Sequence, residues 1–302
     1  MTSLTRYATI VNKLVKTFPS CIDSIGPDGI KFKSANSIDY CEELRRLMQK
    51  ADFKTEKIIV LVDEFASTVE NIIQDENERA AIHFLETMRS IRQDPAMHNK
   101  LQFIYAGSIG LENVVGRMNQ VNLVADLAPI AVPTLTKKEV EKLIAIIFYG
   151  SDVKFAEGAF EYLSDIIEWW IPYYFQILLD ESYKVIAERS SVVIAKDDID
   201  AAVKNSLKQR IYFEHWFARL RKAYKGNDFS FVKELLNIVS ERKKVSSSEV
   251  FDCAVKYGLG NSYTDLMNAL KHDGYISNND NPREYHFNSS LLREWWYANV
   301  AN

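Results

Sequence analysis

Two adjacent carboxylates follow an apolar run in the stretch KIIVLVDEF, where Ile58 to Val62 lead into Asp63 and Glu64. Such a run predicts a short buried strand, so that replacing Leu61 by Asp should unfold the domain. Ligands of parallel α/β sheets bind at the carboxyl ends of the strands, where this pair must lie. There an Asp can hold magnesium through water, and a Glu can orient the water that attacks a γ-phosphate. The alternative is that Asp63 caps the following helix.

The segments around this pair alternate between helix and strand. Helical spacing of apolar residues predicts helices over residues 1–18, 37–51 and 75–94. A second short strand is expected within residues 100–110, where it ends in Gly-Ser, and a third near residues 128–133. This order is typical of a three-layer α/β/α domain with a parallel sheet.

From residue 135 onward the sequence is mainly helical. Thr136 and Glu139 have the spacing of a capping box at a helix start, and so do Ser246 and Glu249. The last 70 or so residues read as three helices followed by two short strands, which predicts a winged helix. Winged helices bind DNA or other proteins, and the even charge of this segment slightly favours a protein contact.

Composition excludes several classes of protein. The chain has 302 residues, a net charge of -4 and three cysteines without metal-binding spacing. Cysteine usage therefore favours a reducing cytoplasm and argues against a disulfide framework or a structural zinc site. No stretch reaches the roughly 20 apolar residues that cross a bilayer, so no membrane contact is expected.

These motifs, in this order, resemble those of the AAA-like P-loop ATPases, in the branch that includes the archaeal-type and STAND ATPases. IIVLVDEF resembles the Walker B strand, which implies that Asp63 holds magnesium and Glu64 is catalytic. LQFIYAGSIGL resembles the sensor 1 strand, with Ser108 near the γ-phosphate. WIPYYFQIL resembles a lid motif in which Pro172, followed by Tyr173, approaches the nucleotide.

The chain departs from this family in one respect: it contains no G-x-x-x-x-G-K-[ST] motif and no Gly-Lys dipeptide. A P-loop needs those glycines and that lysine to enclose the phosphates. If the resemblance holds, the chain begins after the P-loop, either as a shortened relative or as one that a partner polypeptide completes. The sheet would then lack an interior strand, and we expect neighbouring strands to close the gap or a second chain to cover it.

Other candidate residues are weaker. Arg117 follows the sensor 1 strand and could act as an arginine finger, although nothing in the sequence fixes its direction. The histidines have no metal-binding spacing. The segment 208–225 interleaves Lys and Arg with aromatic residues, which suits either nucleic-acid phosphate or a helix core edged by basic side chains.

We therefore expect an incomplete AAA-like core at residues 1–134, a helical lid at 135–224 and a winged helix at 225–302. The leading hypothesis is a regulatory or switch ATPase that binds ATP and magnesium between core and lid and cannot hydrolyse ATP alone. The alternative is a nucleotide-free protein on a degenerate ATPase scaffold, which binds a protein partner or DNA through its winged helix and segment 208–225. Protein partners or self-association are expected in either case.

Overall fold

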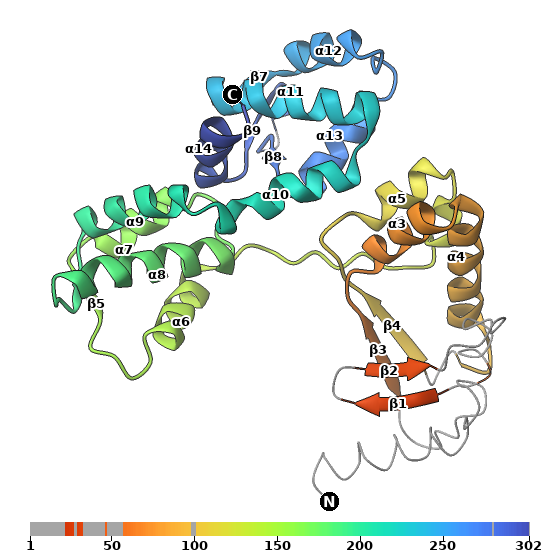
Figure 1. The fold of residues 1–302 in the computed structure, drawn as a ribbon, viewed down its shortest axis with the longest axis horizontal. Helices are drawn as coiled ribbons and strands as arrows, with labels where there is room; N and C mark the ends of the chain where they lie inside the picture. The colour runs from red at the N-terminus through yellow and green to blue at the C-terminus, as the bar shows by residue number, and fades with distance from the viewer. Residues whose placement is uncertain are drawn as a thin grey trace, which may run out of the picture. The chain divides into compact units, whose positions relative to one another are not determined.

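The computed structural model describes residues 22–26, 29–32, 46, 57–97, 101–279 and 281–301 (Figure 1). The chain divides into two compact units. One comprises Met1–Val60 with His83–Phe103, and the other comprises Leu61–Ile82 with Ile104–Asn302. The predicted helix over residues 1–18 lies outside the described residues, and so does that over 37–51 apart from Arg46.

Both strands that frame the candidate site are confirmed. They are β3 (Ile58–Val62) and β4 (Leu101–Tyr105), which are neighbours in a two-stranded sheet. A separate antiparallel hairpin is formed by β1 (Ile22–Gly26) and β2 (Gly29–Phe32).

The strand predicted near residues 128–133 is wrong, because this stretch has no regular structure. Pro129 and Pro133 lack backbone N–H groups and cannot complete a ladder there. The apolar side chains between them are exposed, Ile130 by 77% and Val132 by 91%. An apolar run broken by two prolines is therefore an extended connection in this chain.

The prediction that Leu61 is buried is also wrong. Leu61 is 73% exposed and Ile59 is 57% exposed, while Ile58, Val60 and Val62 are half-buried. Alternating exposure means that one face of β3 is covered and the other is not. Among the described residues, β4 is the only strand hydrogen-bonded to β3. Closure of the gap by strands or by a second chain stays a prediction.

Three helices belong to the same part of the chain. They are α3 (Phe65–Asp75), α4 (Glu78–Gln93), which confirms the helix predicted over 75–94, and α5 (Leu111–Arg117). A 3-10 turn, η1 (Val121–Leu123), follows α5. Helices α3 and α5 pack together and bury Phe65, Val69, Val114 and Val115. Apolar residues of both helices thus form a small core beside the carboxyl end of β3.

Five helices occupy residues 137–223. They are α6 (Lys137–Ile147), α7 (Ala159–Ile166), α8 (Pro172–Glu188), α9 (Lys196–Lys208) and α10 (Arg210–Ala223). Two short parallel strands, β5 (Lys154–Phe155) and β6 (Val193–Ile194), pair between them. The capping box of Thr136 and Glu139 is present at the start of α6, as the sequence predicts.

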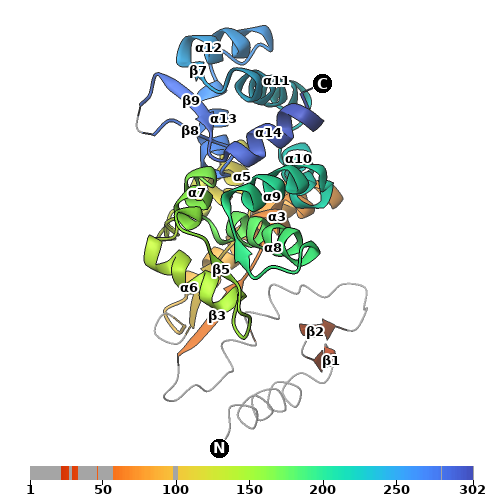
Figure 2. The same ribbon diagram turned by 90° about the vertical axis from the view of Figure 1, so that its left-hand side faces the viewer.

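The C-terminal segment, residues 225–302, forms four helices and a small sheet (Figures 1 and 2). The helices are α11 (Gly226–Arg242), α12 (Ser247–Lys256), α13 (Tyr263–His272) and α14 (Ser290–Asn299). Strand β9 (Glu284–Phe287) lies between β7 (Val245–Ser246) and β8 (Ile276–Ser277), antiparallel to both. The predicted capping box of Ser246 and Glu249 begins α12.

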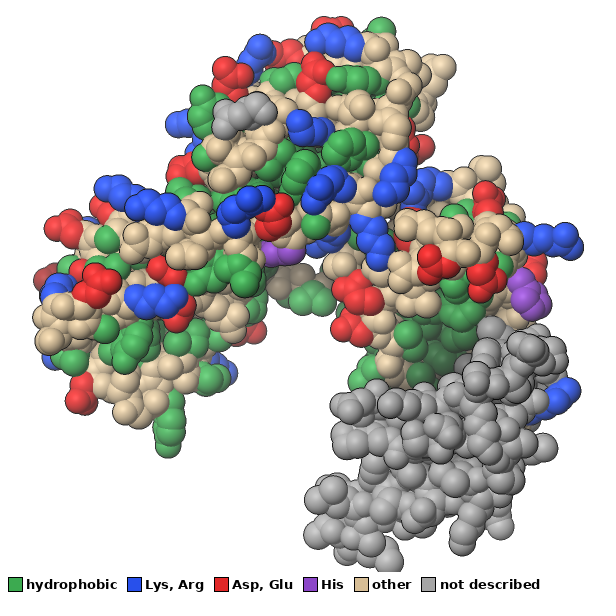
Figure 3. Space-filling view, in the orientation of Figure 1, with side chains coloured by type: hydrophobic (Ala, Val, Ile, Leu, Met, Phe, Trp, Pro, Cys, Tyr) green, Lys and Arg blue, Asp and Glu red, His purple; other side chains and the backbone are tan. Residues whose placement is uncertain are grey.

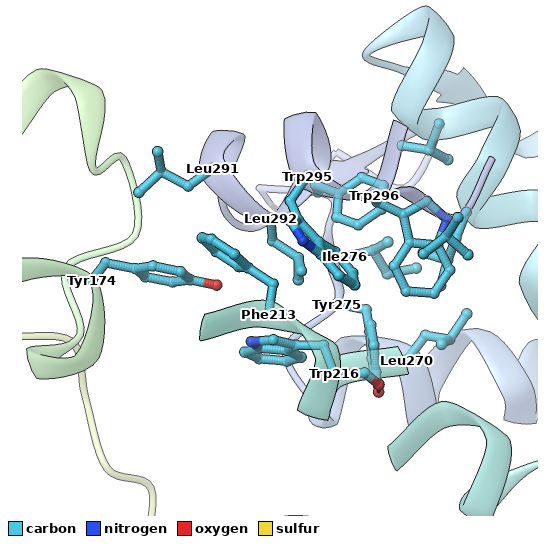
Figure 4. Packing of buried hydrophobic residues seen from close by; sticks show 14 of the residues in the cluster. Tyr174, Phe213, Trp216, Leu270, Tyr275, Ile276, Leu291, Leu292, Trp295 and Trp296 are labelled. Carbon is cyan, nitrogen blue, oxygen red and sulfur yellow. Dashed lines mark hydrogen bonds between the residues drawn. The ribbon is translucent and has the colours of Figure 1, made fainter. Parts of the chain in front are cut away.

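One aromatic-rich core joins the C-terminal segment to α8 and α10 (Figure 4). Phe213 stacks on Trp295 at 5.8 Å between ring centroids, and Trp216 meets Tyr275 edge to face at 5.3 Å. The hydroxyl of Tyr275 donates a hydrogen bond to the backbone carbonyl of Trp216 at 2.7 Å. Large rings of this kind contribute most of the apolar burial in a core. Helix α10 is therefore anchored to the C-terminal segment along its length.

No helix in the described part of the chain is long and apolar enough to cross a membrane.

The exposure of Leu61 makes a testable prediction. Leu61→Asp should lower the free energy of unfolding by about 1 kcal/mol or less, because the new charge stays in water. Val69→Asp is the contrasting variant, since Val69 is fully buried in α3, and it should cost more than about 3 kcal/mol. Urea denaturation of both variants measures the difference, and equal losses would mean that Leu61 is covered.

Candidate functional site

The backbone of Glu64 turns sharply between β3 and α3. Glu64 has φ 53° and ψ 35°, in the left-handed region, and it is the N-cap residue of α3. A residue with a Cβ adopts this conformation at a cost of about 1–3 kcal/mol and keeps it only where neighbouring contacts hold it. The contacts of the Glu64 side chain therefore explain how this backbone conformation is kept.

The Glu64 carboxylate is held by two serines. Its Oε2 atom accepts a hydrogen bond from the Ser67 hydroxyl at 2.8 Å and one from the Ser108 hydroxyl at 3.0 Å. The backbone N–H of Ser108 also points to Oε2, at 3.5 Å. Backbone bonds of Ala106 complete the junction: its N–H donates to Val62, and its carbonyl accepts from Phe65. Two of the predicted site residues, 44 positions apart, are thus brought together.

These contacts keep Glu64 ionised. Partial burial acts to raise the pKa of its carboxyl group, but the hydrogen bonds from Ser67 and Ser108 outweigh burial. The positive charge of Arg219 adds to them, and the pKa lies below its ordinary value. Glu64 is therefore a carboxylate at neutral pH, able to accept a proton or a hydrogen bond.

Asp63 lies beside this pair and does not cap α3. Its Oδ1 atom accepts a hydrogen bond from the backbone N–H of Glu64 at 2.9 Å, and α3 has no side-chain cap at its N-terminus. The side chain is exposed at the end of β3. Among the described residues, no group of three His, Cys, Asp or Glu side chains could hold a metal ion. A magnesium ion at Asp63 would therefore need water and phosphate oxygens as its other ligands.

Pro172 and Tyr173 form the first turn of α8. The Tyr173 hydroxyl donates a hydrogen bond to the backbone carbonyl of Tyr212, and burial raises its pKa to about 12. In the described part of the chain, no hydrogen bond joins either residue to Asp63, Glu64 or Ser108. The structure thus brings Glu64 and Ser108 together, with Asp63 adjacent, and leaves the α8 residues engaged with α10.

Arg117, considered above as a finger, holds the chain together instead. Its guanidinium group pairs with Glu70 of α3, whose side chain is 5% exposed. The same group donates a hydrogen bond to the backbone carbonyl of Ala223 at 3.0 Å. A buried carboxylate needs such a partner. The geometry of Arg117 is thus that of a structural ion pair.

In segment 208–225 the aromatic side chains are mostly buried in the core, and basic side chains lie beside them. Phe213, Trp216 and Leu220 of α10 are buried at three- and four-residue spacing. Arg219 lies over the Trp216 ring at 4.4 Å, and Arg221 lies over the Phe217 ring at 4.8 Å. Figure 3 shows Lys and Arg side chains gathered over α10 on the face in view. Two of these arginines therefore pack on aromatic rings of the same helix.

Sequence reasoning missed two residues that contact this region, Arg219 and Asp273. Arg219 appeared there only as one basic residue of segment 208–225, and Asp273 is a single acid after a helix. Neither belongs to a motif, and each reaches the site through tertiary packing.

The strands β3 and β4, the helices beside them and the carboxylate at the strand end describe an α/β arrangement with a polar site at the end of its strands. No family model matches the chain, and no curated protein matches it. Among solved structures it is similar to the ORC2 protein of Aeropyrum pernix, determined in ADPNP–ADP complexes. That match has a TM-score of 0.51 and 12% identity, and it covers 97% of this chain and 74% of the other.

A second similar structure is Cdc6p from Pyrobaculum aerophilum, with a TM-score of 0.34 and 10% identity over 98% of this chain and 75% of that one. The likeness to the Aeropyrum pernix protein shows that this chain shares the fold of that protein. At this identity the likeness concerns the fold alone.

The hydrogen bond between Ser108 and Glu64 has a measurable consequence for pH dependence. Ser108→Ala should raise the pKa of Glu64 toward its ordinary value, because the ionised form loses one of its two hydroxyl donors and keeps the one from Ser67. The pKa in the folded chain is lowered, so its contribution to stability is present above the ordinary pKa and is lost as pH falls through the lowered value.

A carboxyl ¹³C NMR titration of Glu64 measures this shift. Wild type should titrate lower than Ser108→Ala, and its free energy of unfolding should fall more steeply in the acid range. Thr68→Ala is the control, since its hydroxyl contacts the backbone carbonyl of Glu64 and not the carboxylate. An unchanged Glu64 pKa in Ser108→Ala would contradict the geometry.

The Arg117–Glu70 pair predicts a loss of stability. Arg117→Ala should lower the free energy of unfolding by about 2–4 kcal/mol, because it leaves the buried Glu70 carboxylate without its partner. The double variant Arg117→Met/Glu70→Leu should recover most of that loss, since no charge remains buried. If Arg117→Ala has no effect on chemical denaturation, the ion pair does not form.

Proposed function

We propose that this chain is a nucleotide-dependent regulatory protein of the AAA/STAND type, which binds ATP with magnesium and does not hydrolyse ATP by itself. The observation that carries the proposal is the ionised Glu64 held by Ser108 at the carboxyl ends of β3 and β4, with Asp63 beside it. Binding at that edge is the general behaviour of open α/β sheets. The AAA-like fold makes nucleotide the best-supported ligand.

In this proposal each site residue has one role. Asp63 would hold magnesium through water, Glu64 would orient an attacking water, and Ser108 would contact the γ-phosphate. Magnesium usually keeps several waters and takes only one or two carboxylates from the protein, which suits a site with a single exposed Asp. Pro172 and Tyr173 would contact the nucleotide from the lid, which requires α8 and the strand ends to approach each other.

Catalysis by the chain alone is not proposed, because its sequence has no glycine-rich loop with a lysine to enclose the phosphates. A second polypeptide that carries such a loop would complete the site. The uncovered face of β3, with Leu61 73% exposed, supports a partner at that strand. Binding without turnover is typical of a switch rather than of an enzyme.

We further propose that residues 135–224 are the lid and residues 225–302 the winged helix. The second assignment is supported by three successive helices and a three-stranded antiparallel sheet. In the winged helix, α13 would be the recognition helix, and its only cations are Lys271 and His272. A protein contact therefore suits this face better than DNA. The basic side chains over α10 are the feature that would favour DNA (Figure 3).

Titration calorimetry with ATP and magnesium tests the proposal. Wild type should bind, and Asp63→Asn should bind at least about tenfold more weakly, because the magnesium position loses its charge. Asp75→Asn is the matched control, an exposed Asp at the other end of α3 whose loss should change nothing. The melting temperature of Asp63→Asn should stay close to that of wild type, since Asp63 does not cap α3.

Absence of any heat at millimolar nucleotide would contradict the proposal. The nucleotide-free interaction protein would then be the better account, and binding of duplex DNA by fluorescence anisotropy would separate DNA from protein partners. Equal binding by wild type and Asp63→Asn would mean that the nucleotide is held elsewhere on the chain.

A further inference from the structure

The end of α13 contacts both the turn after β4 and helix α10, within the unit formed by Leu61–Ile82 and Ile104–Asn302. Asp273 follows α13, and its side chain is 4% exposed. Its Oδ1 atom accepts a hydrogen bond from the backbone N–H of Gly110 at 3.1 Å. Its backbone carbonyl accepts another from Nη2 of Arg219 at 2.6 Å. One residue of the C-terminal segment thus contacts both the turn that carries Ser108 and helix α10.

The approach at Gly110 is close. A Cβ atom placed there would lie 2.7 Å from Nδ2 of Asn113 and 3.1 Å from Nδ1 of His272. Contacts shorter than about 3 Å do not occur at real Cβ atoms without movement of a neighbour. The His272 contact places the end of α13 beside the backbone two residues after Ser108, and a side chain at position 110 would have to displace the ends of Asn113 and His272.

Arg219 connects the same residue to the carboxylate. Its guanidinium group is fixed over the rings of Trp216 and Tyr275, at 4.4 and 5.2 Å from their centroids. From that position its charge favours the ionised form of Glu64. The hydrogen bond to the Asp273 carbonyl therefore helps to hold a positive charge near the site.

The residues after Asp273 are fixed as well. Gly274 has φ +85°, and a Cβ atom there would lie 2.5 Å from Cη2 of Trp169. Tyr275 is bonded through its hydroxyl to the carbonyl of Trp216. Because Gly274 lies close to Trp169 and Tyr275 is bonded to α10, we expect a shift of Asp273 to disturb both contacts.

We propose that Asp273 is a positioning residue that couples the Glu64–Ser108 contact to the C-terminal segment. Through Gly110 it holds the turn that presents Ser108, and through its carbonyl it holds Arg219. A shift of the turn that carries Ser108 would then displace the end of α13. A movement of α13 would in turn weaken the hydrogen bond between Ser108 and Glu64. Its use as a nucleotide switch rests on the proposed function, whereas the coupling itself does not.

Hydrogen exchange by NMR on the full chain without nucleotide tests the coupling. In Asp273→Ala the Gly110 amide should exchange about tenfold faster or more, because its acceptor is gone. Asp273→Asn, whose amide oxygen can still accept, should restore exchange to within about threefold of wild type. Asp265→Ala is the matched control, an exposed acid in the first turn of α13.

The second part of the experiment separates coupling from a purely structural role. Ser108→Ala should speed exchange of the Gly274 and Tyr275 amides in the wild-type background and leave it unchanged in the Asp273→Ala background. Asp273→Leu removes the acceptor and keeps a side chain of similar size in the buried position, and it serves if Asp273→Ala does not fold. It should abolish the same response.

An unchanged Gly110 exchange rate in Asp273→Ala would overturn the proposal. So would a response to Ser108→Ala that is equal in both backgrounds. Because no nucleotide is present, failure of the chain to bind ATP would leave these outcomes unaffected, and the two proposals are judged separately.

Discussion

The left-handed backbone of Glu64 is the constraint on which the candidate site depends. It turns the chain between β3 and α3 within one residue and directs the carboxylate toward the turn after β4. The strain is offset by hydrogen bonds that only the ionised carboxylate can accept fully. Local geometry and charge state are therefore linked, because a neutral side chain at this position would accept weaker hydrogen bonds from the two serines.

The C-terminal segment supports the Glu64–Ser108 site through packing and hydrogen bonds. Helix α10 is packed by its aromatic residues into the same core as α14 and β8, and its Arg219 extends from that core. Asp273 and Gly110 add a direct contact to the serine turn. The two-stranded sheet alone offers little burial, so the position of Ser108 depends on helices more than 100 residues later in the chain.

The sequence predicted those features that local chemistry determines. Both strands, the helix after α3 and both capping boxes follow from apolar spacing and from the reach of short polar side chains. The assignment of Glu64 and Ser108 to one site followed from the resemblance of their strands to the Walker B and sensor 1 strands. These are contacts that pattern or topology encodes.

The failures have a common physical cause. Leu61 was expected to be buried because an apolar strand usually has both faces covered, and an uncovered face has no signature within the strand itself. Residues 128–133 looked like a strand because apolar content outweighed their two prolines. Arg117, Arg219 and Asp273 act through long-range packing, which leaves no spacing that a sequence pattern could reveal.

The central claim is that a metal–nucleotide complex binds where Asp63, Glu64 and Ser108 meet. Paramagnetic broadening by manganese tests it most directly, since Mn²⁺ replaces magnesium and broadens the NMR signals of nearby amides. With ATP present, the account predicts that the amide signals of these three residues broaden first and recover when excess magnesium is added. If those signals stay sharp while others broaden, or if broadening does not depend on ATP, the site has been assigned to the wrong place.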